Sequence, residues 1–264
     1  MEEVKDSRRI DFSNNNIVDI GGMRELTRIV HLNLSNNRIK NISIFAQEDC
    51  FVTLKWLDVS SNKFSEFPAF KCPALEYLNI KDNKLEKVNE GWAGHENLRI
   101  LDASDNKFKS LAPFKTMPKL EELYLQKNNI AALAGWETLP VLKILHLRGN
   151  KIDKIEEELP PLDELEVLNL RRNNLKDEET VMRLFQFPKL VDINIINNPV
   201  EQEASSLEVL MATFMIKKPS LKRFCKIAVT EQMQLHAVFQ ARMLWEKSEK
   251  ERREREAEEA AAAA

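Results

Sequence analysis

The segment 142–152, "LKILHLRGNKI", recurs with variations along most of this chain and decides its fold. The shared pattern is leucine, two variable residues, leucine, one variable, leucine, two variable, asparagine, one variable, apolar. Its other copies are "IVHLNLSNNRI" from 29, "LKWLDVSSNKF" from 54, "LEYLNIKDNKL" from 75, "LRILDASDNKF" from 98, "LEELYLQKNNI" from 120, "LEVLNLRRNNL" from 165, a looser "LVDINIINNPV" from 190 and a partial "IDFSNNNI" from 10. The asparagines are 21 to 25 residues apart. Self-similarity at this period predicts a stack of small structural repeats.

Each part of the pattern has a physical role in such a stack. In an extended strand Leu145 and Leu147 point to one face and His146 to the other. Parallel strands that stack in register bury these leucines in one continuous core. The amide of Asn150 can satisfy backbone groups where the chain leaves the strand. We therefore predict an α/β solenoid, right-handed and curved, with a parallel sheet on its concave side.

The pattern changes near residue 200 and predicts three regions. Residues 1–200 form about nine repeats. Residues 201–229 form a C-terminal cap, helical through about Lys217 and then extended. Its helix, its proline turn and its last leucine and aromatic, Leu221 and Phe224, are similar to the cap that closes intracellular leucine-rich-repeat proteins. Residues 230–264 form a charged helical arm with Thr230 as its N-cap. In the return segments between strands, Trp92 and Trp136 occupy equivalent positions and are predicted to fill the core.

Composition excludes several classes of protein. The net charge of −3 lacks the basic excess that nucleic-acid binding requires. The first ten residues have no apolar signal region, and no later run is long enough to span a membrane, so we expect a cytoplasmic protein without a membrane partner. Three cysteines without a paired motif argue against a structural zinc site.

Catalysis is not predicted. The four histidines, His31, His95, His146 and His236, are scattered over different parts of the pattern. The chain has no metalloprotease, nucleophile-elbow or phosphate-loop motif. We expect no enzyme activity, no cofactor and no metal ligand.

The variable strand positions are the candidate binding residues. They form three columns across the sheet, in which large aromatic and charged side chains cluster, and such residue types are enriched at protein interfaces. On the N-terminal part of the sheet these are Trp56, Asp58, Tyr77, Ile100 and Asp102, and farther along they are Tyr124, His146, Arg148 and Arg171. On the arm one helical side carries Leu235, Val238, Phe239, Arg242 and Trp245. All are predicted to contact other proteins.

The repeats resemble the leucine-rich-repeat family, in its roughly 22-residue intracellular class, over residues 10 to about 225. The consecutive segments "LYLQKNNI", "LHLRGNKID" and "LNLRRNNL", followed by the charged arm, resemble the leucine-rich-repeat subunits of ciliary radial spokes. This resemblance implies a structural scaffold of the axoneme that binds other spoke proteins. The repeats also resemble a nuclear regulatory subunit of a protein phosphatase, which implies an enzyme regulator instead, and a spliceosomal repeat protein with fewer repeats.

Overall fold

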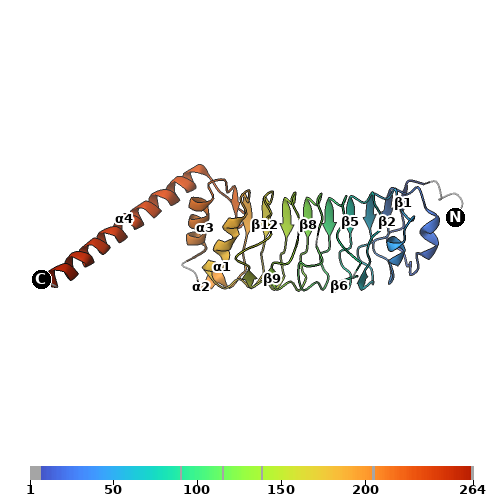
Figure 1. Cartoon of the computed structure of the whole chain (residues 1–264), viewed down its shortest axis with the longest axis horizontal. Coiled ribbons are helices and arrows are strands. Elements are labelled where there is room, and N and C mark those ends of the chain that lie inside the picture. The colour runs from blue at the N-terminus through green and yellow to red at the C-terminus, as the bar shows by residue number, and fades with distance from the viewer. Residues whose placement is uncertain (1–6, 90, 115, 138, 204–205, 263–264) are drawn as a thin grey trace.

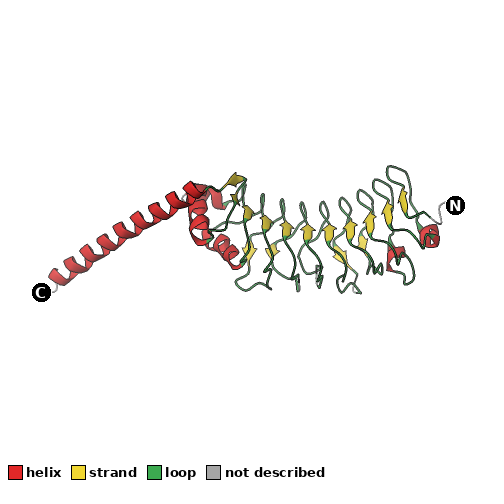
Figure 2. Cartoon of the chain, turned by 90° about the horizontal axis from the view of Figure 1, so that it is seen from above, coloured by secondary structure: helices red, strands yellow, loops and turns green. Residues whose placement is uncertain are grey.

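A computed structural model of the chain describes residues 7–89, 91–114, 116–137, 139–203 and 206–262. Successive turns of the chain form a solenoid, with one eleven-stranded sheet along its length (Figure 1). Helices close the C-terminal end, and a long helix projects from them (Figure 2). The predicted curved solenoid with a parallel sheet is confirmed. The predicted regions 1–200, 201–229 and 230–264 include residues 1–6, 204–205 and 263–264, which lie outside the described residues.

Each repeat contributes one strand of three residues to the long sheet. In spatial order these strands are β1 (Arg9–Asp11), β2 (His31–Asn33), β3 (Trp56–Asp58), β5 (Tyr77–Asn79), β7 (Ile100–Asp102), β8 (Glu122–Tyr124), β10 (Ile144–His146), β12 (Val167–Asn169) and β13 (Asp192–Asn194). They pair in parallel and in register, so that Leu123, Leu145 and Leu168 lie side by side. The central residue of each strand is buried, and its two neighbours are half-buried or exposed, except for Asn194 in β13, which is buried.

The return segments form the opposite side of the solenoid with short and varied structure. They contain the strand pairs β4 (Glu66–Phe67) with β6 (Lys87–Val88) and β9 (Ala132–Leu133) with β11 (Lys154–Ile155), the 3₁₀ helices Gly21–Glu25, Ser43–Ala46 and Arg183–Gln186, and helix α1 (Glu178–Met182). Trp92 and Trp136 are buried here, and their indole N–H groups donate to the carbonyls of Pro113 at 2.7 Å and Pro160 at 3.2 Å. The prediction that both fill the core is confirmed.

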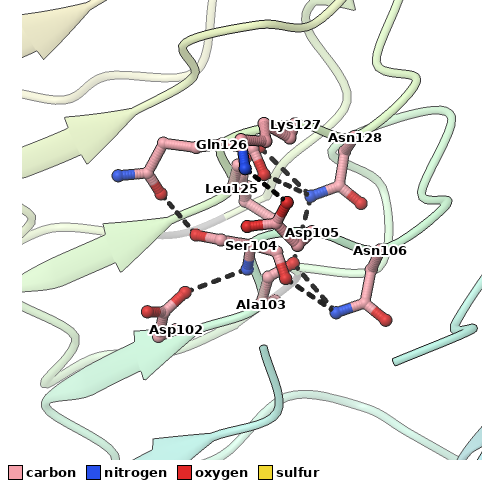
Figure 3. Close-up of polar contacts among 9 residues, drawn as sticks. All are labelled: Asp102, Ala103, Ser104, Asp105, Asn106, Leu125, Gln126, Lys127 and Asn128. Carbon is pink, nitrogen blue, oxygen red and sulfur yellow. Dashed lines mark hydrogen bonds and ion pairs between the residues drawn. The ribbon is translucent and has the colours of Figure 1, made fainter. Parts of the chain in front are cut away.

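The recurrent asparagines join neighbouring repeats, as Figure 3 shows for Asn106 and Asn128. The side-chain nitrogen of Asn128 donates to the carbonyl of Leu125 at 3.1 Å and to that of Ala103, one repeat earlier, at 3.0 Å. Its oxygen accepts from the backbone N–H of Phe108 at 3.0 Å. The same three bonds recur at Asn37, Asn62, Asn106, Asn150, Asn173 and Asn198. We call this set of bonds the asparagine ladder, and it confirms the structural role predicted for these residues.

Asn83 departs from the ladder in one respect. Its side-chain nitrogen donates to the carbonyls of Val59 and Ile80, but its buried oxygen has no partner within the described residues. We find no physical reason for this difference in the neighbouring repeats.

The C-terminal cap covers the last repeat. It contains α2 (Val200–Glu203), α3 (Ser206–Lys217) and the strands β14 (Arg223–Phe224) and β15 (Ile227–Ala228), of which β14 pairs in parallel with β13 and β15 pairs antiparallel with β14. Leu221 and Phe224 are buried, as predicted. Helix α4 (Glu231–Ala262) follows, and the hydroxyl of Thr230 accepts from the backbone N–H of Met233 at 3.2 Å, which is an N-cap bond.

Candidate interaction surface

The outward residues of the strands and of the turns that directly follow them form the solvent-facing surface of the long sheet, which we call the sheet face. Every predicted site residue of the repeats lies on it, and all are half-buried by their neighbours. Within the register, Trp56 lies beside Tyr77 and Tyr77 beside Ile100, while Asp102 lies beside Tyr124 and Tyr124 beside His146. The structure therefore brings these predicted residues together as two adjoining groups.

Most acidic and amide side chains on the sheet face are used by the fold itself. At the third position of seven strands, the Asp or Asn oxygen accepts from the backbone N–H two residues later, which closes the turn after the strand. These residues are Asp11, Asn33, Asp58, Asn79, Asp102, Asn169 and Asn194. Asp58 uses both oxygens, since the second accepts from Asn79 at 2.9 Å. We call these bonds the Asx turns, and the sequence reasoning missed them.

Tyr124 and His146 are the two exceptions among the nine repeat strands. Their rings stack, with centroids 5.2 Å apart and an interplanar angle of 14°. The Tyr124 hydroxyl donates to Glu122 at 2.6 Å, and burial together with this bond raises the pKa of Tyr124. Burial lowers the pKa of His146, although the charges of Asp192 and Glu122 oppose that shift. His146 is therefore a neutral ring at neutral pH.

Three further rings stack on the N-terminal half of the sheet face. The centroid of Trp56 lies 3.8 Å from that of His31 and 5.0 Å from that of Tyr77, with all three rings nearly parallel. Burial, with the charges of Asp58 and Asp102, raises the pKa of Tyr77 to about 12. Because both faces of Trp56 are covered, only its edge is available, and its N–H has no acceptor within the described part of the chain. His31 belongs to this group and was not predicted as a site residue.

Beside the strands, one row of charged side chains alternates in sign and forms ion pairs. Lys55, Glu76, Arg99, Glu121 and Lys143 precede successive strands and alternate in sign. The ion pairs measure 2.8 Å for Lys55 with Glu76, 2.7 Å for Arg99 with Glu121 and 3.3 Å for Lys143 with Glu121. Hydrogen bonds from these cations lower the pKa of Glu76 and of Glu121. We call these residues the charged row.

The other end of the sheet face carries arginines of one sign. Arg148 and Arg171 each lie two residues beyond the end of their strand, in adjacent repeats. Arg171 donates from Nε to the side-chain oxygen of Asn197 at 3.3 Å. Neither guanidinium has a carboxylate partner among the residues that the structure describes.

The predicted apolar side of the arm is exposed. The exposed fractions are 65% for Leu235, 53% for Val238, 61% for Phe239 and 65% for Trp245, and Arg242 pairs with Glu246 at 2.9 Å. Another side of α4 packs on the cap, where Ala237 is buried and Gln234 donates to the carbonyl of Pro219 at 2.9 Å. The role of this exposed side in binding stays a prediction.

The histidines do not converge on one site. His31 lies in β2, His146 in β10 and His236 in α4, while His95 is buried in a return segment. Nε2 of His95 lies 3.1 Å from the carbonyl oxygen of Cys72, and Nδ1 accepts from the backbone N–H of Leu98 at 3.1 Å. Among the described residues, no three His, Cys, Asp or Glu side chains are grouped to hold a metal ion, and no helix could cross a membrane.

Comparisons with known proteins agree with this architecture. Residues 8–47, 96–137 and 118–163 match the family described as "Leucine Rich repeats (2 copies)", and residues 52–108 match "Leucine rich repeat". The chain is 31% identical to chicken Tsukushi over 45% of its own length and 34% of that protein, and 30% identical to mouse Podocan over 78% and 35%. It thus spans about a third of the length of these relatives.

Solved structures agree on the fold. The leucine-rich-repeat domain of APL1 superposes with a TM-score of 0.66 at 20% identity, covering 84% of this chain and 56% of that one. The family matches together cover more than half of the chain. Leucine-rich-repeat proteins are in general scaffolds for protein interactions, and this chain belongs to the leucine-rich-repeat family.

Proposed function

We propose that this chain is a non-catalytic scaffold that binds other proteins through its sheet face and its arm. The proposal rests on the sheet face, where stacked rings, and arginines without a carboxylate partner among the described residues, lie outside the core and are not needed to close the repeats. Aromatic and arginine side chains are the types that dominate the energetics of protein interfaces. Leu235, Phe239 and Trp245 add an exposed apolar surface on a projecting helix.

We propose further that the assembly is the ciliary axoneme, with radial-spoke proteins as partners. Support comes from the resemblance of the segments at 123–130, 145–153 and 168–175, together with the charged arm, to the leucine-rich-repeat subunits of radial spokes. The protein would then reside in the cytoplasm and the axonemal cytoskeleton. Regulation of a protein phosphatase is the alternative.

A tagged chain expressed in ciliated cells tests this proposal. We expect it to remain with the axonemes at high salt and to co-purify with spoke proteins. Removal of residues 230–264, and separately Trp56→Ala with Tyr77→Ala, should each reduce that recovery. Val18→Ala with Val52→Ala is the matched control, because both valines are exposed on return segments. Recovery of a phosphatase catalytic subunit instead would favour the alternative, and unchanged recovery in both test variants would refute the proposed surfaces.

A further inference from the structure

The turns after β8 and β10 lack the side-chain oxygen that closes the other turns of the sheet. In the preceding repeat the carboxylate of Asp102 accepts from the backbone N–H of Ser104 at 2.9 Å (Figure 3). Tyr124 and His146 occupy the equivalent positions and have no such oxygen. In the part of the chain that the structure describes, the N–H groups of Gln126 and Arg148 consequently have no acceptor. Backbone N–H groups are obligatory donors, so these two groups are available to a ligand.

The ring of Tyr124 does not take the place of the missing oxygen. Its hydroxyl bonds to Glu122, which lies two residues earlier on the same strand, whereas Gln126 lies two residues later. Side chains that alternate along a strand share one face, so the ring leans away from the free N–H of Gln126. The Tyr124 hydroxyl therefore does not accept from the N–H of Gln126, and the ring of Tyr124 stacks on that of His146 instead.

Two arginines lie in the same part of the sheet face, since Arg148 carries one of the free N–H groups and Arg171 occupies the equivalent position in the next repeat. Like charges on neighbouring strands repel each other, and the charged row avoids this by alternating its signs. Arg148 and Arg171 are adjacent without such compensation, and nearby acidic groups already have partners. Asp105 pairs with Lys127 at 2.9 Å, and Glu122 accepts from Tyr124. Guanidinium groups prefer carboxylates, which they can bind with two parallel hydrogen bonds.

We propose that an acidic segment of a partner protein binds here, with Asp or Glu carboxylates that accept from the N–H groups of Gln126 and Arg148 and from the two guanidinium groups. A partner carboxylate would thus supply the oxygen that Asp102 supplies in the preceding repeat. Neighbouring strands are about 4.8 Å apart, and side chains four residues apart on a helix are separated by about 5 to 6 Å. A helix with acidic residues at this spacing therefore fits both turns. The inference rests on the proposed scaffold function and specifies the partner.

Peptide binding to the full chain tests the inference. The probe is a fluorescein-labelled, alanine-based helical peptide with two glutamates four residues apart, compared with the same peptide carrying glutamines. We expect the glutamate peptide to bind more tightly by fluorescence anisotropy, with affinity that falls as salt rises. Arg148→Gln with Arg171→Gln should weaken it about tenfold. The control, Lys63→Gln with Lys84→Gln, removes the same charge from exposed positions outside the proposed site and should have little effect on affinity.

A second variant tests the contribution of the free N–H groups to binding separately from that of the positive charge. Tyr124→Asn with His146→Asn restores the residue type that closes the other turns and leaves both arginines in place. We expect it to fold and to lose affinity for the glutamate peptide. In the wild type the amide signals of Gln126 and Arg148 should shift downfield when the peptide binds, in ¹H–¹⁵N spectra.

Three results would overturn the inference. The first is equal binding of the glutamate and glutamine peptides. The second is equal affinity for the glutamate peptide of the two double variants, Arg148→Gln with Arg171→Gln and Lys63→Gln with Lys84→Gln. The third is tighter binding of a single-stranded DNA of matched length than of the glutamate peptide. If any of these occurs while Trp56→Ala with Tyr77→Ala still reduces recovery of axonemal partners, only the acidic ligand is refuted and the scaffold function stands.

Discussion

One backbone position has the same unusual conformation in every turn that follows a repeat strand. The residue before each ladder asparagine has a positive φ, as at Lys127 (52°), Gly149 (71°) and Arg172 (56°). Left-handed backbone costs a residue with a side chain about 1 to 2 kcal/mol, and glycine avoids this cost. A Cβ atom added to Gly149 would meet its nearest neighbour, Cγ of Lys127, at an ordinary 3.5 Å. The constraint at this position is therefore conformational and not steric.

Two glycine substitutions should differ accordingly. Gly149→Ala is expected to lower the free energy of unfolding by about 1 kcal/mol, because only backbone strain is added. Gly94→Ala should lower it by about 3 kcal/mol or more, since its Cβ would lie 1.9 Å from the carbonyl oxygen of Thr116. Urea denaturation measures both changes, and equal losses would contradict the distinction between strain and overlap.

Buried His95 should make the stability depend on pH. Burial lowers the pKa of His95 in the folded state below its ordinary value of 6.5. Below about pH 6.5 the unfolded chain therefore binds more protons at this histidine than the folded chain does. The contribution of neutral His95 to the free energy of unfolding is complete above that pH and is lost as the pH falls. We expect urea denaturation to show a larger loss of stability between pH 7.5 and pH 5.5 in the wild type than in His95→Gln. The pKa values of His31 and His146 are also lowered, but both residues are present in the wild type and in the variant. The difference in pH dependence between the two proteins therefore reports on His95 alone.

Residue roles on the sheet face were only partly predictable. The strand pattern predicts that Asp58 and Asp102 point outward, and they do. Their engagement in Asx turns depends on the direction of the N–H two residues later, which hydrophobic periodicity does not encode. A signal was available in the serine that follows two residues after Asp58 and Asp102. The stacking of His31 on Trp56 depends on side-chain rotamers, which the pattern leaves open.

At the scale of elements, the asparagine ladder links each strand to the one before it. Asn128→Ala would remove an acceptor for the N–H of Phe108 and a donor to two carbonyls. Buried groups left without partners cost about 1 to 3 kcal/mol each, so we expect a loss of about 3 kcal/mol in the free energy of unfolding. Asn129→Ala is the control, since it changes the next asparagine, which lies outside the ladder. A similar loss in both variants would show that the ladder bonds do not matter.

The elements of the sheet were predictable because each buried leucine marks its strand in the same way in every repeat. The end of the cap helix at Lys217 and the start of the arm helix after Thr230 were also predicted from the sequence. The pairs β4 with β6 and β9 with β11 were not predicted. Their segments are two residues long and vary in sequence, so they show no alternation that could be recognised.

At the scale of the whole molecule, each repeat contacts only its neighbours, so stability should propagate along the solenoid from its ends. The cap holds the C-terminal end through Phe214, which is buried with ring centroids 4.6 Å from Phe185 and 5.3 Å from Phe224. Phe214 thereby joins α3 to the last return segment and to the last parallel strand. Its loss should weaken the nearest repeats most.

Phe214→Ala tests this propagation. The cavity should cost about 3 to 5 kcal/mol in the cap. Hydrogen exchange should then accelerate strongly in β14 and β13, less in β12, and hardly in β2 and β3, because each interface passes on only part of the loss. Ile216→Ala is the control, since this side chain on the same helix is exposed. Uniform acceleration from β2 to β14 would instead mean that the solenoid unfolds as one cooperative unit and that the cap stabilises every repeat equally.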